Sequence, residues 1–194
     1  MAGQMKPLIR QTKETRVEVA LKPGGRGRAS VETGIGFLDH MLGTWALYAG
    51  VDLSLRCDGD LHVDAHHTAE DSALALGEAL DVSLGSREGI ARFGWAYAPL
   101  EEALARAALD LARRPFYAGA FPVLPPMLGT LPGEMVPHVL RSFAFAGRFT
   151  LHADVLRSEN GHHAVEAAFK SMGLAFAMAL APKGRGARSA KGVL

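Results

Sequence analysis

The sequence of 194 residues predicts an α+β fold made of two similar halves, with helices packed between two sheets. Two copies of the motif His-His-x-x-Glu carry this prediction: His66–Glu70, and His162–Glu166, which follows it by 96 residues. Behind each copy, apolar residues recur every three or four positions, which is the pattern of a helix with one buried face. In front of each copy, apolar and polar residues alternate, which predicts strands.

The first half, about residues 8–86, is expected to follow the order β-β-α-β-β-α. The expected elements are strands at 9–21 and 28–33, a helix at 37–49, strands at 51–57 and 60–63, and a helix at 66–84. Cys57 falls on the apolar face of its strand, so we expect it to pack in the core. A Gly-x-Gly at 34–36 precedes the first helix. No third glycine follows at the spacing of a dinucleotide-binding turn, and this excludes that kind of site.

The second half, about residues 90–181, is expected to repeat this order. Segments 90–99, 102–114 and 116–121 come before an expected helix at 134–146, a strand at 149–155 and a helix at 162–181. The alanine-rich segment 102–111 has helical propensity, but the repeat favours a strand there. Four prolines predict a long irregular loop before the third helix. We expect one domain over residues 1–194, with a basic, glycine-rich tail at 182–194 that has no means of ordering itself.

Composition limits the classes of function. The formal net charge is +1, which argues against nucleic-acid binding through bulk charge. A single cysteine excludes an internal disulfide and indicates a reducing compartment. Residues 1–10 lack the apolar core of a signal peptide, and the most apolar late segment, 164–181, carries two charged side chains. We therefore expect a cytoplasmic protein that uses no membrane and no nucleic acid.

The paired histidines predict metal sites. Adjacent helical residues point about 100° apart, so one metal ion is not expected to take both His66 and His67. Glu70 lies one turn beyond His66 and is within reach of the same ion. Each motif is therefore expected to serve two metal ions, each completed from elsewhere. Imidazole together with carboxylate suits Mn, Fe, Zn, Ni or Co better than Ca or Mg.

A third position joins the repeat-related set. His40 lies in the first expected helix, and His138 follows 98 residues later in the matching helix. Six of the eight histidines belong to this set, and with two glutamates they supply four ligands to each of two metal ions. The eight candidate ligands are His40, His66, His67, Glu70, His138, His162, His163 and Glu166. The other two histidines, His62 and His152, are expected to be ordinary strand residues.

Three segments, Gly34–Leu42, Gly59–Asp71 and Asn160–Lys170, together resemble the imidazoleglycerol-phosphate dehydratases of histidine biosynthesis. The resemblance runs from about Arg10 to the last residue. It implies a fold of the ribosomal protein S5 domain 2-like class and dehydration of D-erythro-imidazoleglycerol phosphate to imidazoleacetol phosphate. It further implies two Mn²⁺ per active site and a homo-oligomer of 24 subunits built from trimers, with active sites between subunits.

The resemblance also implies roles for individual residues. The substrate ring would react as a metal-bound imidazolate, with the metals acting as Lewis acids and as a template. Glu14 and Glu166 are the candidate catalytic carboxylates, and the sequence leaves open which one is the base. Glu14 also joins the residues that the family places against the phosphorylated substrate: Arg92, Arg114, Lys170, Ser189 and Lys191. The tail at 182–194 would close on the phosphate as a lid.

The chain departs from the common family pattern at four positions. Thr44 and Tyr48 stand where many relatives have glutamine and histidine, Arg113 replaces a glycine, and Phe116 replaces a tyrosine. These changes spare the metal ligands, so they affect the expected substrate contacts and leave the expected reaction class unchanged.

Two other classes of function compete with this interpretation. Another dinuclear lyase, or a hydrolase acting on a phosphorylated small molecule, would use the same kind of centre. A hydrolase of this kind predicts mainly carboxylate ligands, whereas histidines outnumber acids six to two in the candidate set. A non-enzymatic metal-storage shell has no use for phosphate-anchoring residues such as Arg92 and Arg114.

Overall fold

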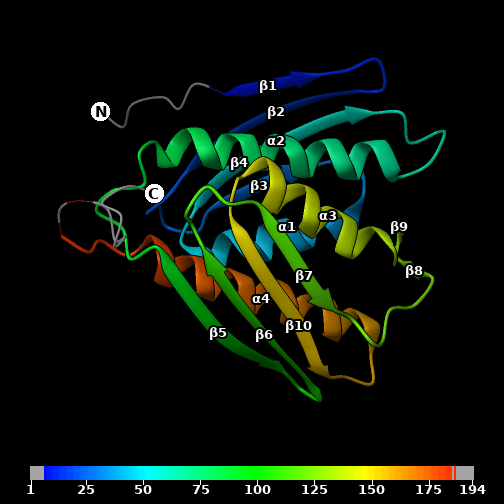
Figure 1. Ribbon diagram of the computed structural model, residues 1–194. Helices are drawn as coiled ribbons and strands as arrows, with labels where there is room; N and C mark the ends of the chain where they lie inside the picture. The colour runs from blue at the N-terminus through cyan, green and yellow to red at the C-terminus, as the bar shows by residue number, and fades with distance from the viewer. Residues whose placement is uncertain (1–6, 185, 187–194) are drawn as a thin grey trace.

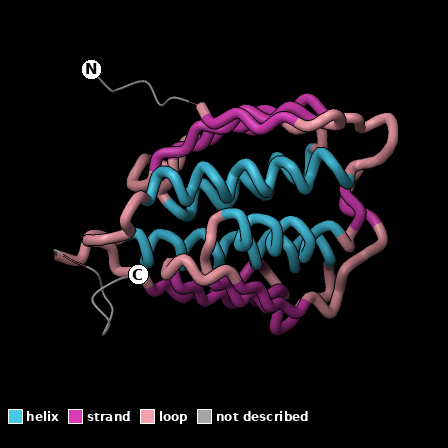
Figure 2. Tube along the Cα trace, turned by 45° about the horizontal axis from the view of Figure 1, so that its top comes forward, coloured by secondary structure: helices cyan, strands magenta, loops and turns pink. Residues whose placement is uncertain are grey.

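The structure is a computed structural model that describes residues 7–184 and 186. Its helices lie in the middle of the molecule, between two outer sheets, as Figure 2 shows. The predicted α+β class with internally duplicated halves is confirmed. Over the part of the chain described, no helix is both long enough and apolar enough to cross a membrane.

The first half forms one sheet and two helices. Its elements are β1 (Leu8–Gln11), β2 (Thr15–Lys22), β3 (Ala29–Glu32), α1 (Gly36–Ala49), β4 (Asp52–Gly59) and α2 (His66–Leu84). The strand order is β1-β2-β4-β3, in which β3 runs parallel to β4 and the other neighbours are antiparallel. Helix α2 packs on β2, so the apolar stripe behind the first motif is buried against the sheet.

The second half repeats this arrangement (Figure 1). Its elements are β5 (Phe93–Leu100), β6 (Ala103–Asp110), β7 (Phe116–Ala120), the two-residue strands β8 (Met127–Leu128) and β9 (Leu131–Pro132), α3 (Met135–Ala146), β10 (Thr150–Arg157) and α4 (Gly161–Leu180). The strand order β5-β6-β10-β7 again places one parallel pair, β7 with β10, at an edge. The alanine-rich segment is strand β6, as the repeat predicted.

The register of the sheets explains why the repeat offset changes along the chain. Val17 pairs with Cys57 in the first sheet, and Ala105 pairs with Val155 in the second. Ala105 therefore follows its counterpart Val17 by 88 residues, whereas Val155 follows its counterpart Cys57 by 98 residues. The ten extra residues lie in the proline-rich connection between β7 and α3, which also contains β8 and β9.

The predicted order β-β-α-β-β-α is wrong in detail, because the four-stranded sheet of each half takes three strands from before the first helix and one from after it; the second half also has the short strands β8 and β9 before α3. The expected strand at 9–21 is broken where Thr12 Oγ1 accepts the N–H groups of Glu14 (3.1 Å) and Thr15 (3.0 Å), which turns the chain. The expected strand Asp60–Val63 is a turn, closed by a 2.8 Å hydrogen bond between its end residues. His62 therefore lies in a turn, not on a strand.

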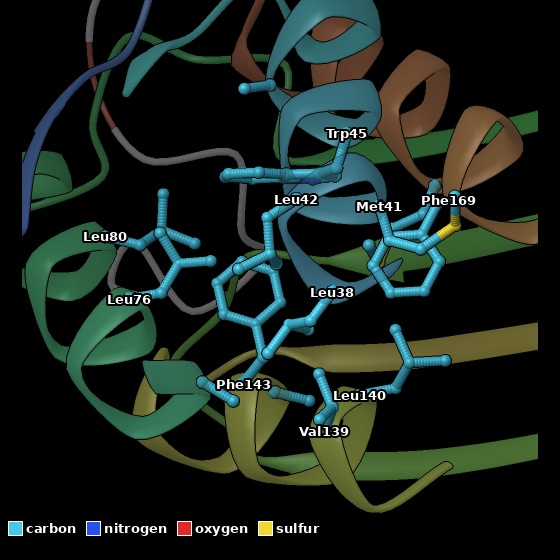
Figure 3. Close-up of a cluster of buried hydrophobic side chains, with 14 of the residues drawn as sticks. Leu38, Met41, Leu42, Trp45, Leu76, Leu80, Val139, Leu140, Phe143 and Phe169 are labelled. Carbon is cyan, nitrogen blue, oxygen red and sulfur yellow. The ribbon is translucent and has the colours of Figure 1, made fainter. Parts of the chain in front are cut away.

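The four helices meet in one apolar core. Helix α2 packs against α3, and α1 packs against α4. Trp45 of α1 is fully buried. Its ring makes edge-on contacts with Phe143 of α3 and Phe176 of α4, with ring centres 5.1 and 5.3 Å apart. Figure 3 shows Trp45 and Phe143 among leucines of the neighbouring helices. Cys57 is buried, as expected for a core residue. This packing fixes the helix ends that carry the candidate ligands.

Candidate metal centre

The first cluster joins helices α2 and α3. His66 and Glu70 lie one turn apart on α2, and His138 reaches them from α3. Nε2 of His138 lies 3.0 Å from Glu70 Oε1, and Nε2 of His66 lies 3.7 Å from Glu70 Oε2. One ligand atom from each of the three residues lies within 4.8 Å of the others. Three donors at this spacing can bind one ion.

The second cluster is its repeat counterpart and joins α4 with α1. Glu166 Oε2 lies 3.2 Å from His162 Nε2 and 3.3 Å from His40 Nε2. Lys170 Nζ donates to the other carboxylate oxygen at 2.8 Å. Burial opposes ionisation of Glu166, but hydrogen bonds from Lys170 and His40 outweigh it and lower the pKa of this carboxyl group. The ionised form is the one that can bind a cation.

The ends of the helices are held by side chains beside each motif. Asn160 Oδ1 caps α4 by accepting the N–H groups of His162 (2.8 Å) and His163 (3.3 Å). Asp64 Oδ1 accepts the N–H of His66 at 2.7 Å, but it lies one residue before the N-cap of α2. Both contacts fix the first turn of a helix, and with it the direction of the histidine pair.

The second histidine of each pair turns away from its cluster, as the helical geometry predicted. Neither His67 nor His163 belongs to the cluster of its neighbour, and the ring planes within each pair are inclined to one another by 83° and 88°. Nδ1 of His67 donates to Asp60 at 2.9 Å, a contact that raises the pKa of the imidazole.

His163 makes the corresponding contact with a different carboxylate. Its Nδ1 donates to Glu102 at 2.9 Å, which raises the pKa of His163 and lowers that of Glu102 to about 2. Six of the eight candidate ligands thus form two groups within one chain, and His67 and His163 stand outside both groups.

The candidate phosphate residues lie in two places, with Lys170 at the second cluster and Arg92 with Arg114 beside Asp110. Arg92 binds Asp110 with two nitrogens at 2.6 and 2.9 Å, and Arg114 lies on the surface with Nη2 3.6 Å from the same carboxylate. The backbone N–H of Arg92 binds the carbonyl of Ala179 near the end of α4. At 1.5 Å per residue, this point is about 25 Å along the helix from His162. Ser189 and Lys191 lie outside the described residues.

Glu14 lies in the turn between β1 and β2, and its side chain is exposed. It is close enough to His67 to raise the pKa of that imidazole, after the larger effect of Asp60. An open depression beside it is lined by Gly34, Asp60 and His62, among others. Glu14 therefore faces the side of the molecule toward which His67 turns.

The positions that depart from the family pattern have defined contacts. Tyr48 lies beside the second cluster, with its ring centre 6.0 Å from Lys170 Nζ, and Thr44 is buried one turn before it.

Arg113 adopts a φ of 54°, a region that glycine enters most easily, and its Nη2 donates to the Gly85 carbonyl at 2.5 Å. The Phe116 ring packs against His152 at 5.5 Å, and His152 is the strand residue that the sequence predicted.

The sequence did not predict that two carboxylates, those of Asp60 and Glu102, are partners of the histidines. Asp60 was noticed only as part of a family motif. Glu102 had a detectable signal, because it follows Glu14 by 88 residues and occupies the same turn of the repeat. The donor chemistry of the two clusters, imidazole nitrogen with carboxylate oxygen, fits a divalent transition-metal ion.

Comparisons with known proteins point to one family. The family model described as imidazoleglycerol-phosphate dehydratase matches residues 33–176. The imidazoleglycerol-phosphate dehydratase of Phaffia rhodozyma is 47% identical over 193 residues, covering 96% of this chain and 94% of the relative. That of Salinispora arenicola is 47% identical over 195 residues, covering 95% and 96%.

Solved structures of the same family share the fold. A crystal structure of the Pyrococcus furiosus protein in complex with (S)-C348 matches with a TM-score of 0.83 and 34% identity, covering 96% of this chain and 100% of that one. A crystal structure from Staphylococcus aureus matches with a TM-score of 0.80 and 28% identity, covering 92% and 99%.

Proposed function

This chain belongs to the imidazoleglycerol-phosphate dehydratase family, and from that premise we propose how its residues perform the family reaction. The reaction is the dehydration of D-erythro-imidazoleglycerol phosphate to imidazoleacetol phosphate in histidine biosynthesis, and the chain is a carbon–oxygen lyase. The family is metal-dependent, and the two His–Glu clusters are two of the three groups of described residues that could hold a metal ion; the third group is Glu101, Glu102 and His163.

We propose that the ions are Mn²⁺ and that each active site uses two of them. His66, Glu70 and His138 would hold one ion. Their repeat counterparts, His162, Glu166 and His40, would hold the other. When bound, the ions supply Lewis acidity and a template for the substrate imidazole. The two clusters support this proposal because each offers three donors of the same kinds in the same arrangement.

The remaining ligands come from other copies of the chain in this proposal. His67 and His163 turn away from the clusters of their own chain, so they are available to complete sites in neighbouring subunits. A 24-subunit shell built from trimers is the assembly that we propose, and we place it in the cytoplasm.

The separation of Arg92 from the clusters supports shared sites as well. Arg92 lies about one helix length from His162 within a chain, too far to contact the same small substrate. We propose that Arg92 and Arg114 of one subunit bind the phosphate of a substrate whose imidazole lies at another subunit's clusters. The tail at 182–194, with Ser189 and Lys191, would close over that phosphate.

The two candidate catalytic carboxylates have different surroundings. Both oxygens of Glu166 are engaged, by Lys170 on one side and by histidines on the other, so Glu166 serves as a ligand. The exposed Glu14 side chain makes no hydrogen bond to any residue that the structure describes. We assign to Glu14 the role of general base, because its carboxylate is available to take a proton from the substrate carbon.

Turnover of imidazoleglycerol phosphate by metal-stripped protein tests this proposal. Added Mn²⁺ is expected to restore formation of imidazoleacetol phosphate, and Mg²⁺, which prefers oxygen ligands, is expected to restore much less. Glu14→Gln should bind Mn²⁺ as the unmodified protein does and lose most of its turnover. Full turnover without metal, or equal turnover with Glu14→Gln, would contradict the respective assignment.

A further inference from the structure

The contacts of His67 and His163 share one geometry. In each, Nδ1 lies 2.9 Å from a carboxylate oxygen, that of Asp60 or that of Glu102. An ionised carboxylate accepts hydrogen bonds and cannot donate them, so Nδ1 must carry the proton. In a neutral imidazole, Nε2 is then the unprotonated nitrogen that can bind a metal. Neither Nε2 has a hydrogen-bond partner among the described residues.

The two carboxylates are not repeat counterparts of each other. Glu102 lies in the turn between β5 and β6, and its counterpart in the first half is Glu14. Asp60 lies in the connection between β4 and α2, where the second half has no carboxylate at the matching positions 156–158. Two different elements thus supply the same contact to the two histidines. Descent from one ancestral half does not by itself explain this agreement, whereas a shared requirement on the histidines does.

The surroundings of Glu102 fix its orientation. Its Oε1 accepts the backbone N–H of Asn160 at 3.1 Å and lies 3.4 Å from the Ser158 hydroxyl group, which leaves Oε2 facing His163. Asp60 is held differently, because its Oδ1 is buried without a hydrogen-bond partner in the described chain and only Oδ2 is engaged. The two sites therefore respond differently when an amide replaces the carboxylate.

We propose that Asp60 and Glu102 are positioning residues that hold His67 and His163 with Nδ1 protonated and Nε2 free to bind metal. The inference deepens the proposed function, since it rests on these histidines being ligands. Carboxylate–histidine–metal arrangements of this kind fix both the tautomer and the ring orientation of a ligand. Each carboxylate belongs to the same chain as the histidine it contacts, so the fold of the chain itself sets the orientation of both rings.

Replacement by an amide distinguishes the two positions. In Glu102→Gln the amide oxygen can accept from Asn160 only if its NH₂ group faces His163. That NH₂ group donates to Nδ1 and moves the imidazole proton to Nε2, which blocks metal binding. In Asp60→Asn the amide oxygen can keep the place of Oδ2 and face His67. The NH₂ group then takes the place of Oδ1, where no hydrogen-bond partner in the described chain dictates which atom it must be. Glu102→Gln is therefore expected to weaken metal binding more than Asp60→Asn.

Solid-state ¹⁵N NMR of histidine-labelled, metal-free protein reads the tautomers directly, with the signals assigned from His67→Ala and His163→Ala. We expect Nδ1–H at both histidines in the unmodified protein. Glu102→Gln should convert His163 to Nε2–H and lower the apparent Mn²⁺ affinity about 10–100-fold. Asp60→Asn should keep Nδ1–H at His67. Glu88→Gln, an exposed glutamate with no side-chain contact recorded in the described chain, is the matched control.

Two results would overturn the inference. One is Nε2–H at either histidine in the unmodified protein. The other is Glu102→Gln protein with the tautomer and the Mn²⁺ affinity of the Glu88→Gln control. Unmodified protein that shows the expected tautomers and binds no Mn²⁺ would instead overturn the proposed metal sites. The metal-free spectra and the metal titration thus separate the two claims.

Discussion

His138 Nε2 lies 3.0 Å from Glu70 Oε1, and this contact joins helix α3 to helix α2 at the first cluster. The repeat reproduces it between His40 and Glu166, at 3.3 Å, where α1 meets α4. Neither contact is local in sequence, so each cluster forms only when the two helices pack. The metal-binding geometry therefore depends on the same helix packing that forms the core.

Removing one histidine from either cluster should empty one metal site. His138→Ala and His40→Ala each take one of three donors from one cluster, so each variant is expected to retain about half of the metal, because the other cluster is intact. His152→Ala is the matched control, since His152 is exposed on β10 and outside both clusters. Metal analysis by mass spectrometry measures the content, and full metal content in both cluster variants would contradict the assignment.

Removal of either outward-facing histidine should affect assembly as well as metal content. In His67→Ala and His163→Ala the clusters of the same chain keep all three donors, but neighbouring subunits lose a ligand. We expect lower metal content and smaller particles in analytical ultracentrifugation. Normal particle size together with full metal content in both variants would rule out shared sites.

Two glycines at the helix crossings should not tolerate alanine. A Cβ atom on Gly77 of α2 would lie 2.6 Å from the backbone nitrogen of Gly147, and one on Gly173 of α4 would lie 2.9 Å from the carbonyl oxygen of Trp45. Backbone atoms cannot rotate away, so overpacking is expected to cost about 1–3 kcal/mol. This cost opposes the gain of about 1 kcal/mol that alanine brings to a helix. We expect a net loss of stability.

Gly43 provides the matched control for the glycine variants. It lies in α1, and a Cβ atom there would meet nothing within 4 Å. Gly43→Ala should therefore raise the free energy of unfolding by up to about 1 kcal/mol, since only the helix propensity changes. Chemical denaturation measures all three variants. Equal effects of the three substitutions would show that close helix packing does not decide the outcome.

Asp52 should make stability depend on pH in the acid range. A hydrogen bond from Arg28, together with backbone N–H groups of Arg26 and Arg28, holds the pKa of Asp52 well below its usual range. A carboxyl group whose pKa is lower in the folded state stabilises the fold. Its full contribution is present above the pKa of the unfolded state, about 3.9, and is lost as the pH falls through the pKa of the folded state. Asp52→Asn should therefore lower Tm at pH 6 and lose most of this effect near pH 2.

Asp58→Asn is the control for the pH experiment. Asp58 lies on the same strand, but its side chain is exposed and pairs with the exposed Arg56 at 3.3 Å. Exposed pairs contribute little to stability, so the Tm of this variant should stay close to that of the unmodified protein at both pH values. A Tm difference for Asp52→Asn that is equally large at pH 2 and pH 6 would contradict the role of its carboxylate.

The sequence predicted the helices well because each carries a long apolar stripe. Helix α2 spans His66–Leu84, and the prediction was 66–84. The strand predictions were wrong at two places where apolar and polar residues alternate through a turn, because the alternation itself does not reveal that the chain turns. One hydroxyl group, on Thr12, reverses the chain inside an alternating segment, and Asp60–Val63 closes a turn although it contains alternating apolar residues.

The candidate site was likewise predicted from the sequence in part. The repeat alone assigned His40 and His138 to the clusters, because packing of helix on helix preserves the register of equivalent residues. It could not show that Arg92 lies near the far end of α4, since that depends on where β5 meets the helix. Nor could it show which carboxylates face His67 and His163, because the two contacts arise from non-equivalent loops.

Anomalous diffraction from crystals of Mn²⁺-loaded protein tests the central claim most directly. We expect two manganese peaks per chain: one between His66, Glu70 and His138, and one between His40, His162 and Glu166. Each ion should be completed by Nε2 of His67 or His163 from another subunit. Active crystals with no manganese at either cluster, or with ions bound by the histidines of a single chain alone, would contradict it.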